Sequence, residues 1–300
     1  MKAPSPRPSL AAAAAATVIR LGRRLLRNTP LQQLPIVTRV YRFVFAWLHP
    51  PGGETSVRYL GSEYIVPTED LTIVPSLMSG DYERAEFEAL EELLRPGDIV
   101  IDVGANVGLH AVFCGARVGP EGRVLAFEPE PVNHGYLVRN VERNGLRNVD
   151  VFLKGAGGRS GTLRLYLAPG DVGTHSAAAT EGGAAIDVEI VRLDDFLRDR
   201  VRRVDLVKID VEGYEAHVMA GLEETVARDR PALLIEFSPH LLRECGGAPE
   251  RLLATLQALY PDIRLFEQAG RPAVPLDARA ARHLLAVTSG SRNLLCTAPR

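Results

Sequence analysis

The residues best suited to chemistry in this 300-residue chain follow two consecutive apolar runs. The first run, 99–103, leads into the turn Gly104-Ala105-Asn106-Val107-Gly108, and the second, 124–127, ends at Glu128. Glycines let a turn approach a ligand closely, and free amides at the start of the following helix attract a carboxylate or a phosphate. A carboxylate at the end of the next strand can accept hydrogen bonds from both hydroxyls of a ribose. The pattern therefore predicts a site for a nucleotide-like cofactor.

The spacing of the glycines separates two kinds of cofactor. A dinucleotide fingerprint requires glycines where this chain has Asn106 and Leu109, so the cradle for a pyrophosphate is broken. The spacing that is present, Asp102-x-Gly104-x-Asn106-x-Gly108, resembles motif I of class I methyltransferases that use S-adenosylmethionine. A nicotinamide-dependent oxidoreductase on the same fold and a purely structural turn are the alternatives.

A second group of charged residues lies in the segment Leu206–Glu215, which reads LVKIDVEGYE. Asp210 and Glu212 fall where the predicted strand ends, and ligands of an open α/β sheet lie outside the carboxyl ends of its strands. Lys208 alternates with them and can pair with a carboxylate, which lowers the cost of burying either charge. The structural alternative is that Glu212 and Gly213 cap the next helix and that Lys208 is a buried partner.

A third group of polar residues, Glu236, Ser238 and His240, follows the next predicted strand. Histidine as a residue type suits a general base near neutral pH, and the position of His240 at a carboxyl end suits contact with a substrate. Its alternative role is in a helix cap after Pro239.

Two further features concern the same crevice. His175 lies in a loop rich in glycine and alanine, 168–185, which is either an active-site loop or a disordered one. Asp210 and Glu236 together offer ligands for a divalent metal. We leave that metal as an alternative and predict no metal ligands, because the sequence shows no tight ligand cluster.

The elements that position these residues alternate between strands and helices. Seven strands with helices on both faces predict a doubly wound, mostly parallel α/β sheet. Helix 82–94 is expected to cover the mouth of the cofactor site, and further strands at 163–167 and 187–191 flank the long loop. The seven core strands are predicted at 99–103, 124–127, 149–153, 205–211, 232–237, 263–266 and 293–297.

Composition favours one large domain with additions. Hydrophobic residues make up 46% of the chain and charged residues 24%, which is ordinary for a globular protein. A formal net charge of -2 gives no electrostatic reason to expect a nucleic-acid partner. The three cysteines form no close pair, so neither a disulfide framework nor a zinc site is predicted, and a reducing, cytoplasmic compartment fits.

Residues 1–53 form a basic arm that contains no acidic residue. Apolar residues between 36 and 48 recur at helical spacing and predict an amphipathic surface helix, and no stretch is long enough to span a bilayer. Peripheral contact with an anionic membrane, packing against the main domain or a second subunit, and a targeting role are the three interpretations. A small hairpin or cap is predicted at 54–80 and the main domain at 81–300.

Five motifs extend the likeness to methyltransferases over about residues 80 to 240: VIDVGANVG, AFEPEP, VRLDDF, VKIDVEGYE and IEFSPHLL, in this order. Together they resemble the FkbM family of S-adenosylmethionine-dependent methyltransferases. The resemblance implies a class I, Rossmann-like sheet with an antiparallel hairpin at one edge. It also implies an O-methyltransferase acting on a hydroxyl of a sugar, a glycan or a secondary metabolite.

The resemblance also implies roles for particular residues. The glycine turn would hold the methionine side of the cofactor, Glu128 the ribose, and the stretch Gly155-Ala156-Gly157-Gly158 would lie beside the adenine, although glycines stand there where polar residues are expected. The implied cofactor ligands are Asp102, Gly104, Ala105, Asn106, Gly108, Glu128, Pro129 and Ala156.

The expected chemistry is in-line displacement at a sulfonium methyl group by a substrate oxygen, so the protein must align the reactants and remove the hydroxyl proton. The candidates for this catalytic work are Asp210, His240, Lys208 and His175. A non-catalytic, membrane-associated scaffold that keeps the arm and the fold is the remaining alternative.

Overall fold

The computed structural model of the chain describes residues 53–68, 70, 73–80, 82–167, 177, 184–267 and 271–299. The amphipathic helix predicted between 36 and 48 and the candidate base His175 lie outside these residues, so both stay predictions. Within the described residues, no helix combines the length and the apolar character needed to cross a bilayer.

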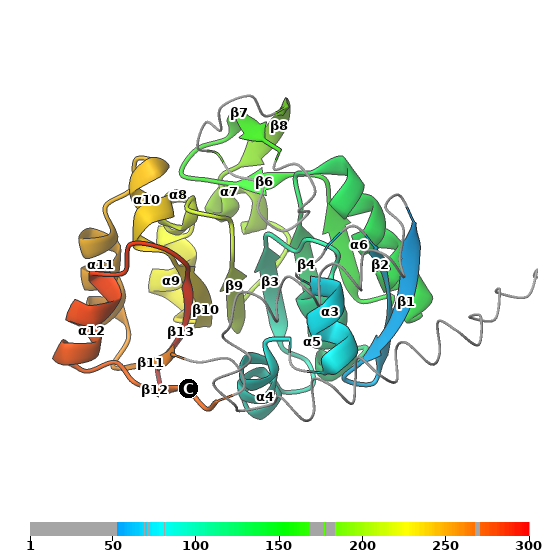
Figure 1. Ribbon diagram of the computed structural model, residues 1–300, viewed down its shortest axis with the longest axis horizontal. Coiled ribbons are helices and arrows are strands. Elements are labelled where there is room, and N and C mark those ends of the chain that lie inside the picture. Colours follow the sequence, from blue (N-terminus) through cyan, green and yellow to red (C-terminus); the bar gives the residue numbers. More distant parts are fainter. Residues whose placement is uncertain are drawn as a thin grey trace, which may run out of the picture.

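A central sheet of eight strands organises the molecule (Figure 1). In spatial order its strands are β12 (Val274–Pro275), β11 (Asp262–Phe266), β13 (Arg292–Thr297), β10 (Ala232–Phe237), β9 (Leu206–Ile209), β3 (Ile99–Val103), β4 (Arg123–Phe127) and β5 (Val149–Phe152). Strands β10, β9, β3, β4 and β5 are parallel, whereas β13 runs antiparallel to both β10 and β11. The predicted doubly wound sheet with an antiparallel edge is therefore confirmed. The prediction of seven strands misses β12, because a strand of two residues shows no periodicity.

The parallel strands are apolar because both faces of the sheet are covered. Ile101, Leu125 and Val207, on three adjacent strands, have no exposed surface. The register also places Asp102 of β3 directly beside Lys208 of β9. A pair of opposite charges is therefore built into the buried centre of the sheet.

Two hydrophobic cores, one on each face of the sheet, hold the helices in place. One face packs against α3 (Ile73–Ser79), α4 (Arg84–Leu93), α5 (Leu109–Val118) and α6 (Pro131–Arg143). The other face packs against α7 (Leu193–Leu197), α8 (Glu215–Ala220), α9 (Glu223–Asp229), α10 (Pro239–Glu244), α11 (Pro249–Leu259) and α12 (Ala278–Leu285).

The predicted hairpin is confirmed as β1 (Glu54–Tyr59) paired antiparallel with β2 (Ser62–Pro67). It belongs to the first hydrophobic core and lies beside α6 (Figure 1). The Asn140 side chain of α6 donates to the carbonyl oxygens of Ile65, at 3.0 Å, and of Val107, at 2.7 Å. One buried amide therefore ties the hairpin to the glycine turn that follows β3.

The strands predicted on either side of the long loop form a separate sheet of three strands. Strands β6 (Gly155–Ala156), β8 (Ala185–Val191) and β7 (Gly161–Tyr166) pair in that order, and they lie at the top of Figure 1. Leu165, Val188 and Ile190 form a small apolar cluster of their own in this sheet. The small sheet overhangs the edge of the central sheet at which the parallel strands end.

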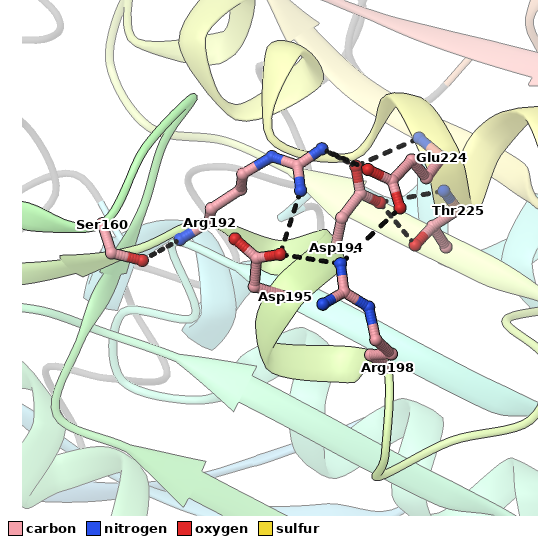
Figure 2. Close-up of polar contacts among 7 residues, drawn as sticks. All are labelled: Ser160, Arg192, Asp194, Asp195, Arg198, Glu224 and Thr225. Atoms are coloured by element: carbon pink, nitrogen blue, oxygen red, sulfur yellow. Dashed lines mark hydrogen bonds and ion pairs between the residues drawn. The ribbon is translucent and has the colours of Figure 1, made fainter.

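The motif VRLDDF anchors the small sheet to α9 through a network of polar contacts (Figure 2). The Asp194 carboxylate accepts hydrogen bonds from the backbone amides of Glu224 and Thr225 and from the Thr225 hydroxyl, at 2.7 to 3.0 Å. Arg192 donates to Asp194 at 2.8 Å, and its own backbone amide donates to Ser160 Oγ. This motif, which also marks the family resemblance, is a structural joint in which the buried carboxylate is satisfied.

Candidate active site

A cavity opens at the carboxyl ends of β3, β4 and β9, which is the place that the strand order predicts for a ligand. It contains about 930 Å³, including the part that is open to solvent. Its walls come from both sides of the sheet and from the small sheet β6-β8-β7. The predicted site residues that line it are Gly104, Ala105, Asn106, Glu128, Pro129, Ala156, Lys208 and Asp210.

The glycine turn forms the floor of the cavity. Gly104 has a φ of 76°, and a Cβ atom there would lie 1.8 Å from the carbonyl oxygen of Asp210, so only glycine fits. The amides of Gly104 and Ala105 both donate to the carbonyl oxygen of Phe127 at 3.0 Å, which fixes the turn against β4. Asn106 lines the cavity, and its buried Oδ1 atom has no hydrogen-bond partner among the described residues. An unsatisfied acceptor in a cavity wall fits a site that a polar ligand completes.

Glu128 is held by the turn in a position that suits a ribose. Its Oε2 atom accepts the amide of Asn106 at 2.8 Å and its Oε1 atom accepts the amide of Glu130 at 2.9 Å. Burial raises the pKa of Glu128 to about 7, while these two amides favour the charged form. Each carboxylate oxygen keeps a lone pair, so the group can still accept hydrogen bonds from two ligand hydroxyls.

The wall next to Glu128 is narrow and apolar. Gly155 and Ala156 line it together with Val188 and Ile190 of β8. A Cβ atom on Gly155 would lie 2.6 Å from Cδ1 of Ile190. The close packing of the small sheet therefore requires glycine at position 155. A flat apolar ring such as adenine fits this wall through its faces.

Lys208 lies under the cavity and is surrounded by acceptors. Its Nζ atom donates to the carbonyl oxygen of Gly104 at 2.8 Å and lies 3.5 Å from carboxylate oxygens of both Asp102 and Asp210. Burial opposes the charge on Lys208, but the two aspartates outweigh it and raise the pKa of Lys208 above its ordinary value. The predicted pairing of Lys208 with a carboxylate is therefore confirmed.

The two aspartates of this cluster differ in access. The Asp102 side chain is 1% exposed, and burial raises its pKa although Lys208 acts in the opposite direction. The Asp210 side chain is 32% exposed and lines the cavity. Asp102 therefore supports the turn from below, and Asp210 is the carboxylate that a ligand can reach.

Three carboxylates gather on the far side of Asp210. Asp210, Glu212 and Glu236 each offer one oxygen, and these three atoms lie within 4.8 Å of one another. Burial and the negative charges of Asp210, Glu212 and Glu215 raise the pKa of Glu236 well above its usual value. The sequence indicated no tight cluster of this kind. Glu236 joins the other two carboxylates only through the pairing of β10 with β9, which no local pattern shows, and the absence of metal ligands stays a prediction.

The structure separates the two predicted bases. Asp210 lines the cavity, whereas His240 does not, and its Nδ1 atom lies 2.9 Å from the hydroxyl of the buried Ser238. The expectation that both residues face the cavity therefore holds only for Asp210. Gly108 and Asp102, which were predicted as cofactor ligands, do not line the cavity. Asp102 is fully buried beneath the glycine turn.

Sequence reasoning missed several residues of the wall, among them two tyrosines and a histidine. Tyr82 precedes α4, His110 lies in the first turn of α5, and Tyr214 precedes α8. Burial raises the pKa of Tyr82 well above its usual value. The expected helix over the mouth of the site was the one available signal for Tyr82, and His110 lies two residues after the end of the first motif.

The comparison with protein families decides between the alternative readings of this cavity. Residues 102–269 match the family model described as the methyltransferase FkbM domain. The chain belongs to this family. The matched residues run from the glycine turn through the small sheet to the strand β11, so they include every residue that lines the cavity except Ile73 of α3 and Tyr82.

Three curated methyltransferases are similar to part of this chain. The chain is 33% identical over 157 residues to methyltransferase sdnD of Sordaria araneosa, which covers 42% of this chain and 60% of that protein. It is 33% identical over 161 residues to the 31-O-demethyl-FK506 methyltransferase FkbM of Streptomyces tacrolimicus, covering 44% and 62%. It is 31% identical over 144 residues to the hexuronic acid methyltransferase AglP of Haloferax volcanii, covering 46% and 57%. The matched part of the chain thus spans about 60% of the length of each of these three relatives.

Membership of the FkbM family makes S-adenosylmethionine the cofactor of this domain. The residues of the cavity fit it. Glu128 can hold the ribose hydroxyls, the wall at Gly155 and Ile190 accommodates the adenine, and Asn106 offers an unsatisfied acceptor. The broken dinucleotide fingerprint and the family match both oppose the nicotinamide alternative.

Proposed function

We propose that this protein transfers a methyl group from S-adenosylmethionine to a hydroxyl of a sugar, a glycan or another small-molecule acceptor. One observation carries the proposal: an accessible carboxylate, Asp210, shares the cavity with the ribose-binding arrangement at Glu128. The names of two relatives, a hexuronic acid methyltransferase and a 2-O-methyltransferase, are consistent with acceptors of this class.

The residues of the cavity divide the work of the reaction. When bound, S-adenosylmethionine supplies an electrophilic methyl group that a hydroxyl oxygen attacks in line. Glu128 and the wall at Gly155 and Ile190 hold the adenosine part, which leaves the side of the cavity next to Asp210 for the reacting groups. Tyr82 and Tyr214 line the cavity from opposite faces of the sheet, and their rings keep bulk water away from that side.

Asp210 is the proposed proton acceptor. The Asp210 side chain is 32% exposed, so its carboxylate can reach a hydroxyl of the acceptor. Lys208 lies 3.5 Å from both Asp210 and Asp102, and its positive charge offsets the negative charge of the buried Asp102. Asp210 would take the hydroxyl proton as the oxygen displaces sulfur from the methyl carbon, so that the carbon–oxygen bond would form while the carbon–sulfur bond breaks and leaves S-adenosylhomocysteine. His240, which does not line the cavity, serves in this proposal only to fix the segment after β10 through Ser238.

The experiment is transfer of labelled methyl groups from S-adenosylmethionine to small-molecule and glycan fractions of the source cells, separated by charge and size. We expect label in a fraction that stays base-stable, as an ether does and a methyl ester does not. Label that appears only in base-labile products would show that the acceptor group is a carboxylate and not a hydroxyl. Binding of NADH with no binding of S-adenosylhomocysteine would instead favour the oxidoreductase.

A further inference from the structure

Three carboxylates meet beside the cavity, where two neighbouring strands end. Asp210 and Glu212 follow β9, and Glu236 lies near the carboxyl end of β10, which pairs with β9. One oxygen from each of the three residues lies within 4.8 Å of the other two. Asp210 and Glu212 also line the cavity, so this carboxylate cluster opens into the space that the proposed acceptor shares with the cofactor.

The principal charges around the cluster are negative. Burial, and after it the charges of Asp210, Glu212 and Glu215, raise the pKa of Glu236. Lys208 lies 3.5 Å from Asp210, but it lies at the same distance from Asp102. One positive charge is thus divided between two aspartates, and a further cation would be attracted to the cluster.

Two buried carboxylate oxygens at this place have no hydrogen-bond partner among the described residues. One is Oε2 of Glu236, and the other is Oε2 of Glu215, whose residue has no exposed surface. The Glu215 Oε1 atom accepts the amides of Val211, at 3.2 Å, and Gly213, at 3.0 Å, which flank Glu212. Glu215 therefore packs against the turn that carries the cluster. Because buried acceptors in native proteins are normally paired, these oxygens indicate a ligand that supplies positive charge.

The chemistry of the cluster selects the kind of cation. Carboxylate oxygens suit Mg²⁺, Mn²⁺ or Ca²⁺, whereas zinc and copper favour imidazole or thiolate ligands. Oxygen ligands lie about 2.0 to 2.6 Å from such ions, so oxygens up to about 5 Å apart can bind the same ion. These ions usually take about six ligands or more, so an ion held by three carboxylates keeps positions open for other oxygens.

We infer that Asp210, Glu212 and Glu236 bind a divalent cation of the Mg²⁺ or Mn²⁺ kind, and that this cation binds oxygen atoms of the acceptor. The second part rests on the proposed function, whereas cation binding itself does not. A hydroxyl bound to a divalent cation loses its proton more easily. Each carboxylate offers one oxygen to the ion, so Asp210 keeps the other for that proton. The acceptor class narrows to hydroxyls with a second oxygen nearby, such as those of a sugar ring.

The test measures Mn²⁺ binding directly, in the full chain after removal of metals with EDTA. Glu236→Gln removes one charged ligand, and Glu236 does not line the cavity, so the cofactor site stays intact. Glu212→Gln is a second variant at a partly exposed position, where an amide is accommodated without a buried partner. Glu244→Gln is the matched control, because Glu244 is an exposed glutamate outside the cluster.

Calorimetry should show one Mn²⁺ site in each wild-type chain, weakened about 10- to 100-fold in Glu236→Gln and in Glu212→Gln. Glu244→Gln should bind Mn²⁺ as the wild type does, and all four proteins should bind S-adenosylhomocysteine within about twofold of one another. The EDTA-treated wild type should transfer methyl groups at least about tenfold more slowly than the same protein with Mn²⁺ restored.

Three results would count against the inference. No Mn²⁺ binding by the wild type, or equal Mn²⁺ affinity in the wild type and both cluster variants, would overturn the cation site and leave the methyltransferase proposal intact. Normal Mn²⁺ binding with a rate that EDTA does not change would show that the cation does not bind the acceptor. A wild type that binds Mn²⁺ but no S-adenosylhomocysteine would instead contradict the proposed function and leave the cation site in place.

Discussion

Two clusters of acidic residues in this protein are built on opposite principles. Around Asp194, each buried carboxylate oxygen accepts hydrogen bonds, and Arg192 balances the charge (Figure 2). Around Lys208, by contrast, Asp102 has no hydrogen-bonded oxygen among the described residues, and the pKa of Glu128 is raised to about 7.

The contrast separates a structural motif from a functional one. A satisfied buried carboxylate stabilises the fold, and the Asp194 network joins the small sheet to α9. Around Lys208 the buried charges are balanced by ion pairs rather than by a full set of hydrogen bonds, which costs stability, and such a cost is typical of functional sites. Both motifs are part of the same family resemblance, so the sequence likeness alone does not tell them apart.

The largest effect is expected at Asp210. Asp210→Asn removes the proposed proton acceptor, and a positioned base contributes about 10²- to 10⁴-fold in rate, so methyl transfer should fall by that order. Affinity for S-adenosylhomocysteine should change by less than about threefold. Labelled methyl transfer and calorimetry measure the two quantities. Asp195→Asn, in the other cluster, is the matched control, and equal losses in both variants would remove the distinction between the clusters.

Stability should depend on Asp194 instead. Asp194→Ala leaves two backbone amides and the Thr225 hydroxyl without their acceptor, so we expect the free energy of unfolding to fall by about 2 to 4 kcal/mol. Urea unfolding measures this change. The folded variant should keep its cofactor affinity, and a loss of affinity with unchanged stability would contradict the structural role.

Replacing Glu83 should raise the free energy of unfolding instead of lowering it. Its pKa is raised to about 8 in the folded state, against about 4.3 for an unperturbed glutamate. The folded protein therefore binds the proton of Glu83 more tightly than the unfolded chain does. Below about pH 4 both states are protonated and Glu83 does not lower the free energy of unfolding, whereas between about pH 4 and 8 that free energy falls as pH rises. Glu83→Gln should stabilise the protein by about 1 to 3 kcal/mol at pH 9 and by almost nothing at pH 4.5. A destabilised variant at pH 9 would show that the carboxylate is satisfied after all.

The smallest effect is expected at His240. Because this residue does not line the cavity, His240→Ala should lower methyl transfer by no more than about threefold and should leave the pH profile unchanged. Rates measured between pH 5.5 and 8.5 test this. Loss of a limb that titrates between about pH 6 and 7 would restore His240 as the base.

The sequence predicts the sheet and the cofactor half of the site well, because both depend on local patterns. Apolar runs such as Ile99–Val103 mark buried parallel strands, and the turn after that run identifies the floor of the cavity. The position of Glu128 follows from the same logic, since ligands bind beyond the carboxyl ends of adjacent strands.

The rest of the site depends on contacts between distant segments and was predicted less well. Glu83 and His110 meet only because α4 packs on α5, and a left-handed residue before a helix leaves no pattern in the sequence. Glu236 joins Asp210 only through the pairing of β10 with β9. His240 was misplaced because the strand pattern fixes where β10 ends but not where the helix after it turns the side chain.

Titration of S-adenosylhomocysteine into the wild type and into Glu128→Ala tests the central claim, that this cavity binds the cofactor through the glutamate after β4. Because hydrogen bonds to a charged acceptor contribute about 1.5 to 3 kcal/mol, the variant should bind about 10- to 100-fold more weakly than the wild type. Thermal unfolding of the variant shows that it is folded. Equal affinity in the two proteins, or no binding by the wild type, would contradict the account.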